Sequence, residues 1–286
     1  MSAGAHSTLI MGIINVTPDS FSGDGLLAHQ DYVQHAVAHA EQMLAEGADI
    51  LDVGGESSRP GALPVALDEE IRRVVPVVSA IRKKFGAVPI AVDTIKAEVA
   101  EQSLQEGATI LNDITALAGN ARMAELAARH KVQVVLMHNS ASLGAVSHDE
   151  KIGKSYDALD TQDIIADVTR DLKKRVEFAM QAGIARDKII IDPGIGFGKT
   201  LPQNLALIAN MQKIKPLGFP VMMALSRKSF IGQALDLPVD ERLEGTAACT
   251  ALCAFLGADI VRVHDVKFMT RIVKMATALR EATLSD

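Results

Sequence analysis

The feature that most constrains this chain is the repeated alternation of a short apolar run with a longer amphipathic segment. The short runs are rich in Ile and Val and are continuously apolar, a pattern typical of parallel strands buried on both faces. We expect strands at 9–15, 49–54, 88–93, 109–113, 132–138, 188–192, 220–225 and 259–264. We expect helices at 31–46, 67–85, 96–106, 120–130, 160–182, 204–215, 228–235, 245–256 and 269–282.

Eight strand–helix units in a chain of 286 residues suit a (β/α)8 barrel, or TIM barrel, of roughly 250 residues plus loops. Gly-Ala pairs such as Gly47-Ala48 follow several of the expected helices, where glycine suits the left-handed residue after a helix end. We therefore predict an α/β fold with a single domain over residues 1–286. A doubly wound open sheet is the alternative.

Composition narrows the class of protein. With 29 basic and 35 acidic residues the net charge is −6, and there are only 8 Phe, 2 Tyr and no Trp, so the chain is a poor candidate for binding nucleic acid. No apolar stretch reaches the roughly 20 residues of a membrane-spanning helix. No secretory signal is visible at the N-terminus, and we expect a cytoplasmic protein without a membrane partner. Cys249 and Cys253 are expected in a buried helix.

Polar side chains gather at the carboxyl ends of the expected strands, where barrel enzymes carry their active sites. One group is cationic: Arg59 follows strand two, Lys228 follows strand seven, and Arg262 and His264 lie on strand eight. Because these strands lie close together in a closed barrel, the group could surround one anion, and phosphate is the natural candidate. The alternative is that Arg262 pairs with a nearby carboxylate and that His264 is satisfied locally.

A second group of polar residues is acidic or neutral. Asp93, Asn112 and Asp192 end strands three, four and six, and we expect them to face one another across the barrel. Such side chains offer donors and acceptors to a flat heterocycle, and an unpaired buried carboxylate needs a ligand or a cation. Lys228 could supply that cation, and a structural Asp–Lys pair is the alternative. With no G-x-S-x-G nucleophile motif and no metal-ligand triad, the sequence favours binding of a heterocycle and an anion.

Seven short runs, in order along nearly the whole chain, resemble the dihydropteroate synthase family. They are 12–22, 52–61, 92–94, 111–114, 192–199, 226–229 and 262–266. The resemblance implies a (β/α)8 barrel transferase of folate biosynthesis. It joins 6-hydroxymethyl-7,8-dihydropterin pyrophosphate to p-aminobenzoate and releases pyrophosphate and 7,8-dihydropteroate. Homodimers are usual in the family.

Carried over residue by residue, the resemblance implies three subsites. The pterin pocket would be formed by Asp93, Asn112, Met137, Asp192, Gly196, Phe197 and Lys228. The pyrophosphate site, where the family uses Mg²⁺ and Asn15 matches a metal-ligand position, would be formed by Asn15, Arg59, Arg262 and His264. The p-aminobenzoate site would be formed by Phe21, Ser58, Pro60 and Ser229. Asp93, Lys228, Arg262 and His264 are the expected catalytic residues, in a dissociative substitution without a covalent enzyme intermediate.

The chain departs from the family pattern at three places. It reads Gly23-Asp24-Gly25 where the family usually reads Asp-Gly-Gly, and Ser58 stands where Thr is common. The segment 139–141 replaces the usual Met-x-Gly after Met137-His138. These changes predict altered sulfonamide sensitivity.

Two other functions stay open. Methyltetrahydrofolate–corrinoid methyltransferases share the barrel and the pterin pocket but need no pyrophosphate site, so the runs at 226–229 and 262–264 favour the synthase. A non-catalytic pterin-binding paralogue is the third possibility, because Asp24 is displaced by one position.

Overall fold

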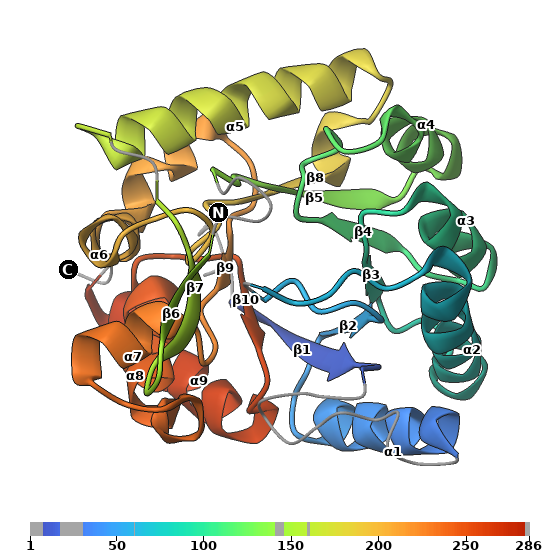
Figure 1. Cartoon of the computed structure of the whole chain (residues 1–286), viewed down its shortest axis with the longest axis horizontal. Helices are drawn as coiled ribbons and strands as arrows, with labels where there is room; N and C mark the ends of the chain where they lie inside the picture. Colours follow the sequence, from blue (N-terminus) through green and yellow to red (C-terminus); the bar gives the residue numbers. More distant parts are fainter. Residues whose placement is uncertain (1–7, 18–30, 60, 141–145, 159–160, 284–286) are drawn as a thin grey trace.

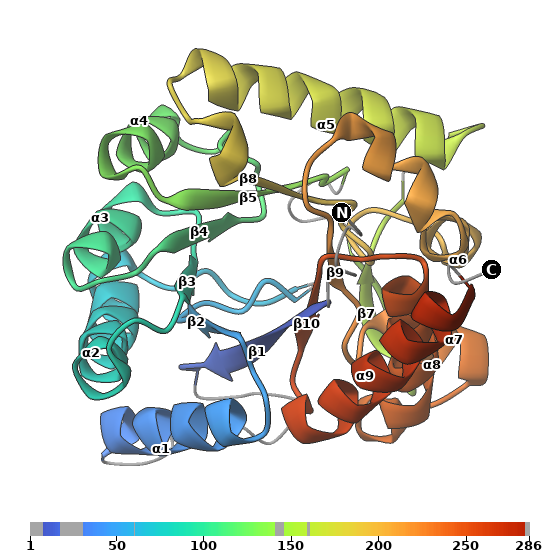
Figure 2. The ribbon, with the colours of Figure 1, turned by 180° about the vertical axis from the view of Figure 1, so that it is seen from behind.

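The computed structural model describes residues 8–17, 31–59, 61–140, 146–158 and 161–283. Figures 1 and 2 show parallel strands at the centre of the molecule and helices around them. The eight parallel strands are β1 (Leu9–Asn15), β2 (Ile50–Gly54), β3 (Ile90–Asp93), β4 (Ile110–Asp113), β5 (Gln133–Met137), β8 (Ile189–Asp192), β9 (Met222–Ala224) and β10 (Ile260–Val263). All eight expected strands are confirmed, with ends that differ by at most two residues.

The order of the strands identifies the fold. Neighbouring strands follow the order β8-β5-β4-β3-β2-β1-β10-β9, and every hydrogen-bonded pair in this sheet is parallel. A parallel bridge between Ile191 and Val221 joins the first and last strands, and the Ile191 amide donates to the Pro220 carbonyl at 2.9 Å. The sheet therefore curls into a near-closed (β/α)8 barrel, which confirms the prediction and excludes the doubly wound alternative.

The helices follow the strands as expected in most places. They are α1 (Tyr32–Ala45), α2 (Leu67–Phe85), α3 (Ala97–Gln105), α4 (Ala121–His130), α5 (Ile164–Gln181), α6 (Leu201–Ala209), α7 (Ser229–Leu235), α8 (Leu243–Phe255) and α9 (Val266–Thr283). The expected cysteine positions are also borne out, because Cys253 is buried and Cys249 is partly buried in α8. Across the described ranges, no helix has the length and apolar character needed to cross a membrane.

The prediction of one helix over 204–215 was wrong at both ends. The helix begins earlier because Thr200 and Gln203 form a reciprocal capping box at its N-terminus. It ends at Ala209, and two short 3-10 turns follow, η3 (Met211–Lys213) and η4 (Lys215–Leu217). Pro216 lies in the second turn, where its missing amide hydrogen is incompatible with the interior of a continuous α-helix.

An antiparallel hairpin that the sequence analysis did not predict follows β5. It consists of β6 (Val146–Asp149) and β7 (Gly153–Tyr156). The Asp149 carboxylate accepts hydrogen bonds from the amides of Lys151 and Ile152, and Gly153 has a φ of +87°, so the turn is locally specified. Its strands are short and largely polar, which is why their alternation gave no clear signal. Figure 1 shows the hairpin on the side of α6, α7 and α8.

The barrel interior contains two layers of side chains. The apolar layer takes one residue from each parallel strand: Met11, Ile50, Ala91, Ile110, Val135, Ile190, Met222 and Ile260. Because strand side chains alternate between faces, the residues two positions later also point into the barrel, and they lie nearer the carboxyl ends of the strands. We call these the polar layer: Ile13, Asp52, Asp93, Asn112, Met137, Asp192, Ala224 and Arg262. The strand register thus stacks a charged layer directly on an apolar one.

Candidate active site

A buried ion cluster lies at the centre of the polar layer. The Arg262 Nε contacts Asp52 Oδ2 at 2.5 Å, and its Nη2 contacts Asp93 Oδ2 at 2.8 Å. The amide of Asn112 donates to the same Asp52 oxygen at 3.2 Å. Four strands therefore meet through one guanidinium and two carboxylates, and the planar fork of arginine suits such a bridge. The alternative considered from the sequence, that Arg262 pairs with a nearby carboxylate, is the observed arrangement.

Burial has the largest effect on the protonation of Asp93. It raises the pKa of Asp93 to about 7; the positive charge of Arg262 opposes this shift, and the negative charge of Asp52 adds to it. Asp52 is fully buried, and its Oδ1 has no hydrogen-bond partner among the described residues. Because a buried unpaired oxygen is costly, this atom is a ready acceptor for a donor group on a bound molecule.

Asp192 and Lys228 lie at the same end of the barrel but do not form the structural Asp–Lys pair that was the alternative considered from the sequence. Asp192 is buried and accepts a hydrogen bond from the Gly194 amide at 2.7 Å. Lys228 donates to the Ile195 carbonyl at 2.6 Å, and its Nζ lies 4.8 Å from the centre of the Phe197 ring. Within the described residues no ion pair joins Lys228 to Asp192 or Asp93. Asp93 pairs with Arg262 instead, whereas the positive charge of Lys228 opposes the rise that burial causes in the pKa of Asp192. Lys228 therefore balances Asp192 through longer-range electrostatics and not through an ion pair.

The environment of Lys228 lowers the affinity of its amine for a proton. Burial lowers the pKa of Lys228 to about 8, although the nearby negative charge of Asp192 opposes the shift. Gly196 makes room for this side chain, because a Cβ atom there would lie 3.3 Å from the Lys228 Cδ, and its φ of +84° favours glycine. The loop after β8 and the lysine therefore form one packed unit.

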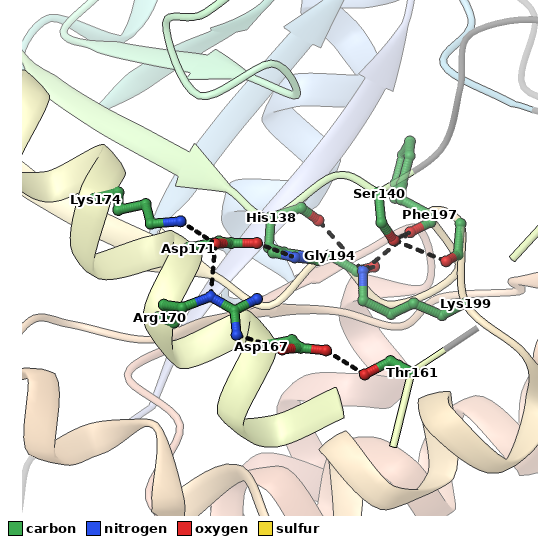
Figure 3. Close-up of polar contacts among 11 residues, drawn as sticks. His138, Ser140, Thr161, Asp167, Arg170, Asp171, Lys174, Gly194, Phe197 and Lys199 are labelled. Atoms are coloured by element: carbon green, nitrogen blue, oxygen red, sulfur yellow. Dashed lines mark hydrogen bonds and ion pairs between the residues drawn. The ribbon is translucent and has the colours of Figure 1, made fainter. Parts of the chain in front are cut away.

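The loop at 194–198 is held from behind by Lys199, which is only 5% exposed. Figure 3 shows its ammonium among three backbone carbonyls, those of Gly194 at 2.7 Å, Phe197 at 3.0 Å and His138 at 3.3 Å. Ser140 adds hydrogen bonds to the carbonyl of Phe197 at 3.2 Å and to that of Gly198 at 2.8 Å. Three acceptors match the three donors of an ammonium group, so the charged form fits best. Burial nevertheless lowers the pKa of Lys199 to about 7.

Three of the predicted pyrophosphate residues, Arg59, Arg262 and His264, lie close enough for the charges of the two arginines to act on the histidine. Burial lowers the pKa of His264 well below its usual value, and the positive charges of Arg262 and Arg59 add to that shift. The His264 ring is therefore neutral at pH 7, which differs from the cationic role expected from the sequence. Its Nδ1 lies 2.9 Å from the Ser226 hydroxyl. Asn15 is partly buried at the end of β1 and pairs in register with Gly54.

The predicted aminobenzoate residues are only partly described. Ser58 is partly buried in the loop after β2, and its carbonyl accepts a hydrogen bond from the Tyr156 hydroxyl at 3.0 Å. Ser229 is partly buried at the start of α7, next to Lys228. The predictions for Phe21 and Pro60, and the displaced Asp24, lie outside the described residues. Met137 is buried at the end of β5 and pairs in register with Asp192.

Sequence reasoning missed three residues of this site. Asp52 was quoted within a motif but given no role, although a charged residue inside an apolar strand is itself a signal of a buried partner. Lys199 follows a glycine-rich loop and gave no signal of burial. Tyr156 lies on the unpredicted hairpin, and nothing local in the sequence links it to Ser58 or to Phe197.

Comparison with known sequences places the chain in a family. The sequence model of the family described as pterin binding enzymes matches residues 11–264. The dihydropteroate synthase of Bacillus subtilis (strain 168) is 47% identical over 274 residues, which cover 96% of this chain and 89% of that protein. The dihydropteroate synthase of Escherichia coli (strain K12) is 43% identical over 276 residues, which cover 96% of this chain and 92% of that protein.

Solved structures give the same result. The Yersinia pestis dihydropteroate synthase with a sulfonamide drug complex has a TM-score of 0.85 and 39% identity, and the match covers 98% of this chain and 95% of that chain. The Xanthomonas albilineans enzyme in complex with 7,8-dihydropteroate has a TM-score of 0.81 and 37% identity, and the match covers 96% and 94% of the two chains. These similarities cover nearly the whole chain, and they show that it belongs to the dihydropteroate synthase family, transferases of folate biosynthesis.

Proposed function

We propose that this chain joins 6-hydroxymethyl-7,8-dihydropterin pyrophosphate to p-aminobenzoate and releases pyrophosphate and 7,8-dihydropteroate. The observation that carries the proposal is the buried cluster of Arg262 with Asp52, Asp93 and Asn112 at the carboxyl end of the barrel. A purely apolar ligand would leave the donors and acceptors of this cluster without partners. The family relationship adds the substrate class, since a solved relative carries 7,8-dihydropteroate.

The polar layer suits a pterin ring. Asn112 and the carboxylates of Asp93 and Asp192 offer an amide donor and several acceptors to ring nitrogens and an exocyclic amino group. When the bond to pyrophosphate breaks, positive charge develops on the ring and its methylene carbon. A carboxylate fixed nearby stabilises that charge without reorganising. Ionised Asp93 is the group we assign to this role.

The departing pyrophosphate would lie at the Arg59, Arg262 and His264 side of the site. Arginine forks bind phosphate oxygens, and a neutral His264 can donate one hydrogen bond. The carbon–oxygen bond to pyrophosphate breaks first, and its electron pair leaves on the pyrophosphate. The amine of p-aminobenzoate then forms the bond to the methylene carbon and loses a proton. No covalent enzyme intermediate is formed, because the nucleophile is the second substrate and not a side chain of the protein.

Mg²⁺ fits the residues at this position. The described residues hold no group of three or more His, Cys, Asp or Glu side chains arranged around one point. Mg²⁺ typically uses one or two protein oxygens, several waters and substrate phosphates, so it does not need such a group. We assign the amide oxygen of Asn15, at the end of β1, as the protein ligand. The bound ion would neutralise charge on the pyrophosphate.

The chain is proposed to act as a homodimer. Helices α8 and α9 pack side by side and expose apolar side chains around a groove, among them Leu252, Phe255, Met275 and Leu279. A contiguous exposed apolar patch of this kind is typical of a subunit interface. Light scattering after gel filtration would test it: we expect a dimer for the native chain and a monomer for Met275→Asp. A monomeric native chain would contradict the proposal.

The reaction is tested by incubating the purified protein with Mg²⁺, the dihydropterin pyrophosphate and p-aminobenzoate, and following 7,8-dihydropteroate by chromatography. We expect product only when all three are present. Tight pterin binding without product would contradict the synthase activity and favour the non-catalytic paralogue. Methyl transfer from methyltetrahydrofolate to a corrinoid would favour the methyltransferase.

Altered sulfonamide sensitivity stays a prediction from the departures at Ser58 and at Asn139-Ser140-Ala141. We expect an inhibition constant for sulfamethoxazole well above the KM for p-aminobenzoate. An inhibition constant within a few-fold of that KM would contradict the prediction.

A further inference from the structure

The β6–β7 hairpin lies outside the repeating strand–helix units, yet one of its side chains contacts two loops of the proposed site. The Tyr156 ring stacks on Phe197, with ring centres 5.6 Å apart and planes 25° apart. The hydroxyl of the same residue donates to the Ser58 carbonyl at 3.0 Å. Ser58 belongs to the loop after β2 and Phe197 to the loop after β8, so Tyr156 bridges segments far apart in the sequence.

The hairpin is anchored to the body of the barrel. Arg242 is only 2% exposed. It donates to the Ile152 carbonyl at 2.7 Å and to the Arg227 carbonyl at 3.2 Å. The turn of the hairpin is therefore held by the residue that precedes α8, and Tyr156 lies on the second strand of this anchored hairpin.

Tyr156 acts on these loops through different atoms. Its ring covers one side of Phe197, while the Lys228 ammonium lies 4.8 Å from the centre of that same ring. Phe197 is only 7% exposed and belongs to the proposed pterin pocket. The Tyr156 hydroxyl contacts the backbone carbonyl of Ser58, a proposed aminobenzoate residue. Burial raises the pKa of Tyr156 above its usual value, so the hydroxyl keeps its proton and remains a donor.

We propose that Tyr156 is a positioning residue with two separable roles: its hydroxyl holds the Ser58 loop for p-aminobenzoate, and its ring holds Phe197 for the pterin. This inference rests on the proposed function, because it assigns the two loops to those two substrates. It predicts that each substrate responds to a different part of one side chain.

Two variants separate the roles. Tyr156→Phe removes the hydroxyl and keeps the ring, so we expect the KM for p-aminobenzoate to rise about fivefold, with the KM for the dihydropterin pyrophosphate within twofold of the native value. Tyr156→Leu removes both contacts. We therefore expect the same rise in the KM for p-aminobenzoate and, in addition, a rise of about threefold to tenfold in the KM for the dihydropterin pyrophosphate. In both variants kcat is expected to stay within about twofold of the native value.

Lys151→Ala is the matched control on the same hairpin. Lys151 pairs with Asp236 at 2.5 Å on the surface, and among the described residues its side chain forms no hydrogen bond or ion pair with either loop. Both KM values are therefore expected to be unchanged. Titration of 6-hydroxymethylpterin by calorimetry gives a readout that does not depend on turnover: its Kd should rise for Tyr156→Leu and not for Tyr156→Phe.

Two results would overturn the inference. One is equal KM values for native protein and Tyr156→Phe. The other is a change in the two KM values by the same factor in both variants, which a general loosening of the hairpin would produce. Failure of the native chain to form dihydropteroate would instead contradict the proposed function, while the calorimetric comparison would still test the role of the Tyr156 ring.

Discussion

The apolar layer and the polar layer of the barrel are built by the same eight strands, two residues apart, yet they have opposite chemistry. In the apolar layer Ile110 packs among Ile, Val, Met and Ala side chains. In the polar layer Asn112, on the same strand and the same face, bonds to Asp52, which in turn bonds to Arg262. One layer is stabilised by burying apolar surface, whereas the other places charges where water has been removed.

The difference shows that the apolar layer contributes to stability alone, whereas the polar layer carries function and also affects stability. Apolar burial stabilises at about 25 cal/mol per Å² regardless of orientation, so the apolar layer needs volume rather than particular groups. The polar layer depends on particular pairs, because an uncompensated buried charge is strongly destabilising. It also leaves Asp52 Oδ1 without a partner among the described residues, a feature that an apolar core would not have.

The largest expected effect comes from Arg262→Ala. This change leaves the buried carboxylates of Asp52 and Asp93 without their cation, so the free energy of unfolding should fall by about 3–5 kcal/mol. Turnover should fall by at least about a hundredfold. Binding of a pterin without pyrophosphate should persist in the folded fraction, as measured by calorimetry. Equal loss of turnover and pterin binding would contradict the assignment of Arg262 to the pyrophosphate.

A change in the apolar layer should affect stability alone. Ile110→Ala removes a side chain that is 1% exposed, so denaturant unfolding should show a loss of about 2–5 kcal/mol. The KM values of the folded enzyme should be unchanged, because the side chain faces the layer below the substrates. A rise in the pterin KM of more than about threefold would show that the two layers are not independent.

The pH dependence should come from the polar layer. Since Asp93 has a pKa of about 7 when folded and 3.8 as its ordinary value, the folded chain keeps a proton that the unfolded chain releases. This carboxyl therefore makes the protein less stable as pH rises from about 4 to about 7. Asp93→Asn should remove that part of the slope in unfolding measurements. An unchanged slope would contradict the shift.

Asp93 should also set the loss of activity on the acid side of the pH profile, the acid limb of kcat/KM. Because ionised Asp93 is the form that stabilises positive charge on the ring, kcat/KM should rise with pH around a midpoint near 7. In Asp93→Asn activity should be low and the limb should be absent. A limb that persists in this variant would assign it to another group.

A smaller effect on substrate binding is expected from Lys199, which supports the loop at 194–198. Lys199→Met removes three hydrogen bonds from the loop at 194–198, so the pterin KM should rise about tenfold. Lys199→Arg keeps the charge and should retain more affinity than Lys199→Met. Equal pterin KM values for native protein and Lys199→Met would contradict a role for Lys199 in holding this loop.

Sequence reasoning predicted the repeating part of the fold well. Continuous Ile and Val runs such as Ile189–Ile191 have few alternatives to a buried parallel strand, and the Gly-Ala pairs mark helix ends. It failed where structure depends on distant partners. The β6–β7 hairpin is short and polar, and it is hydrogen-bonded to Arg242 and Ser58, which no local pattern connects to it.

Sequence reasoning predicted which residues lie in the candidate site better than it predicted which of them form ion pairs with one another. The position of Asp93, Asn112 and Arg262 at strand ends follows from the period of the strands. Which cation balances which carboxylate depends on side-chain reach across the barrel, so Lys228 was assigned where Arg262 is found. The burial of Lys199 depends on three carbonyls from two loops, which the sequence does not place together.

The most direct test of the account compares two substitutions on β4, two residues apart. Native protein, Asn112→Ala and Ile110→Ala would each be titrated in the folded state with 6-hydroxymethylpterin by calorimetry, and the thermal unfolding of each would be measured on separate samples. We expect Asn112→Ala to lose at least about tenfold in pterin affinity and about 1–3 kcal/mol of stability. We expect Ile110→Ala to lose about 2–5 kcal/mol of stability with unchanged pterin affinity. If Ile110→Ala loses pterin affinity in parallel with Asn112→Ala, the claim that the polar layer holds the substrate and the apolar layer does not is wrong.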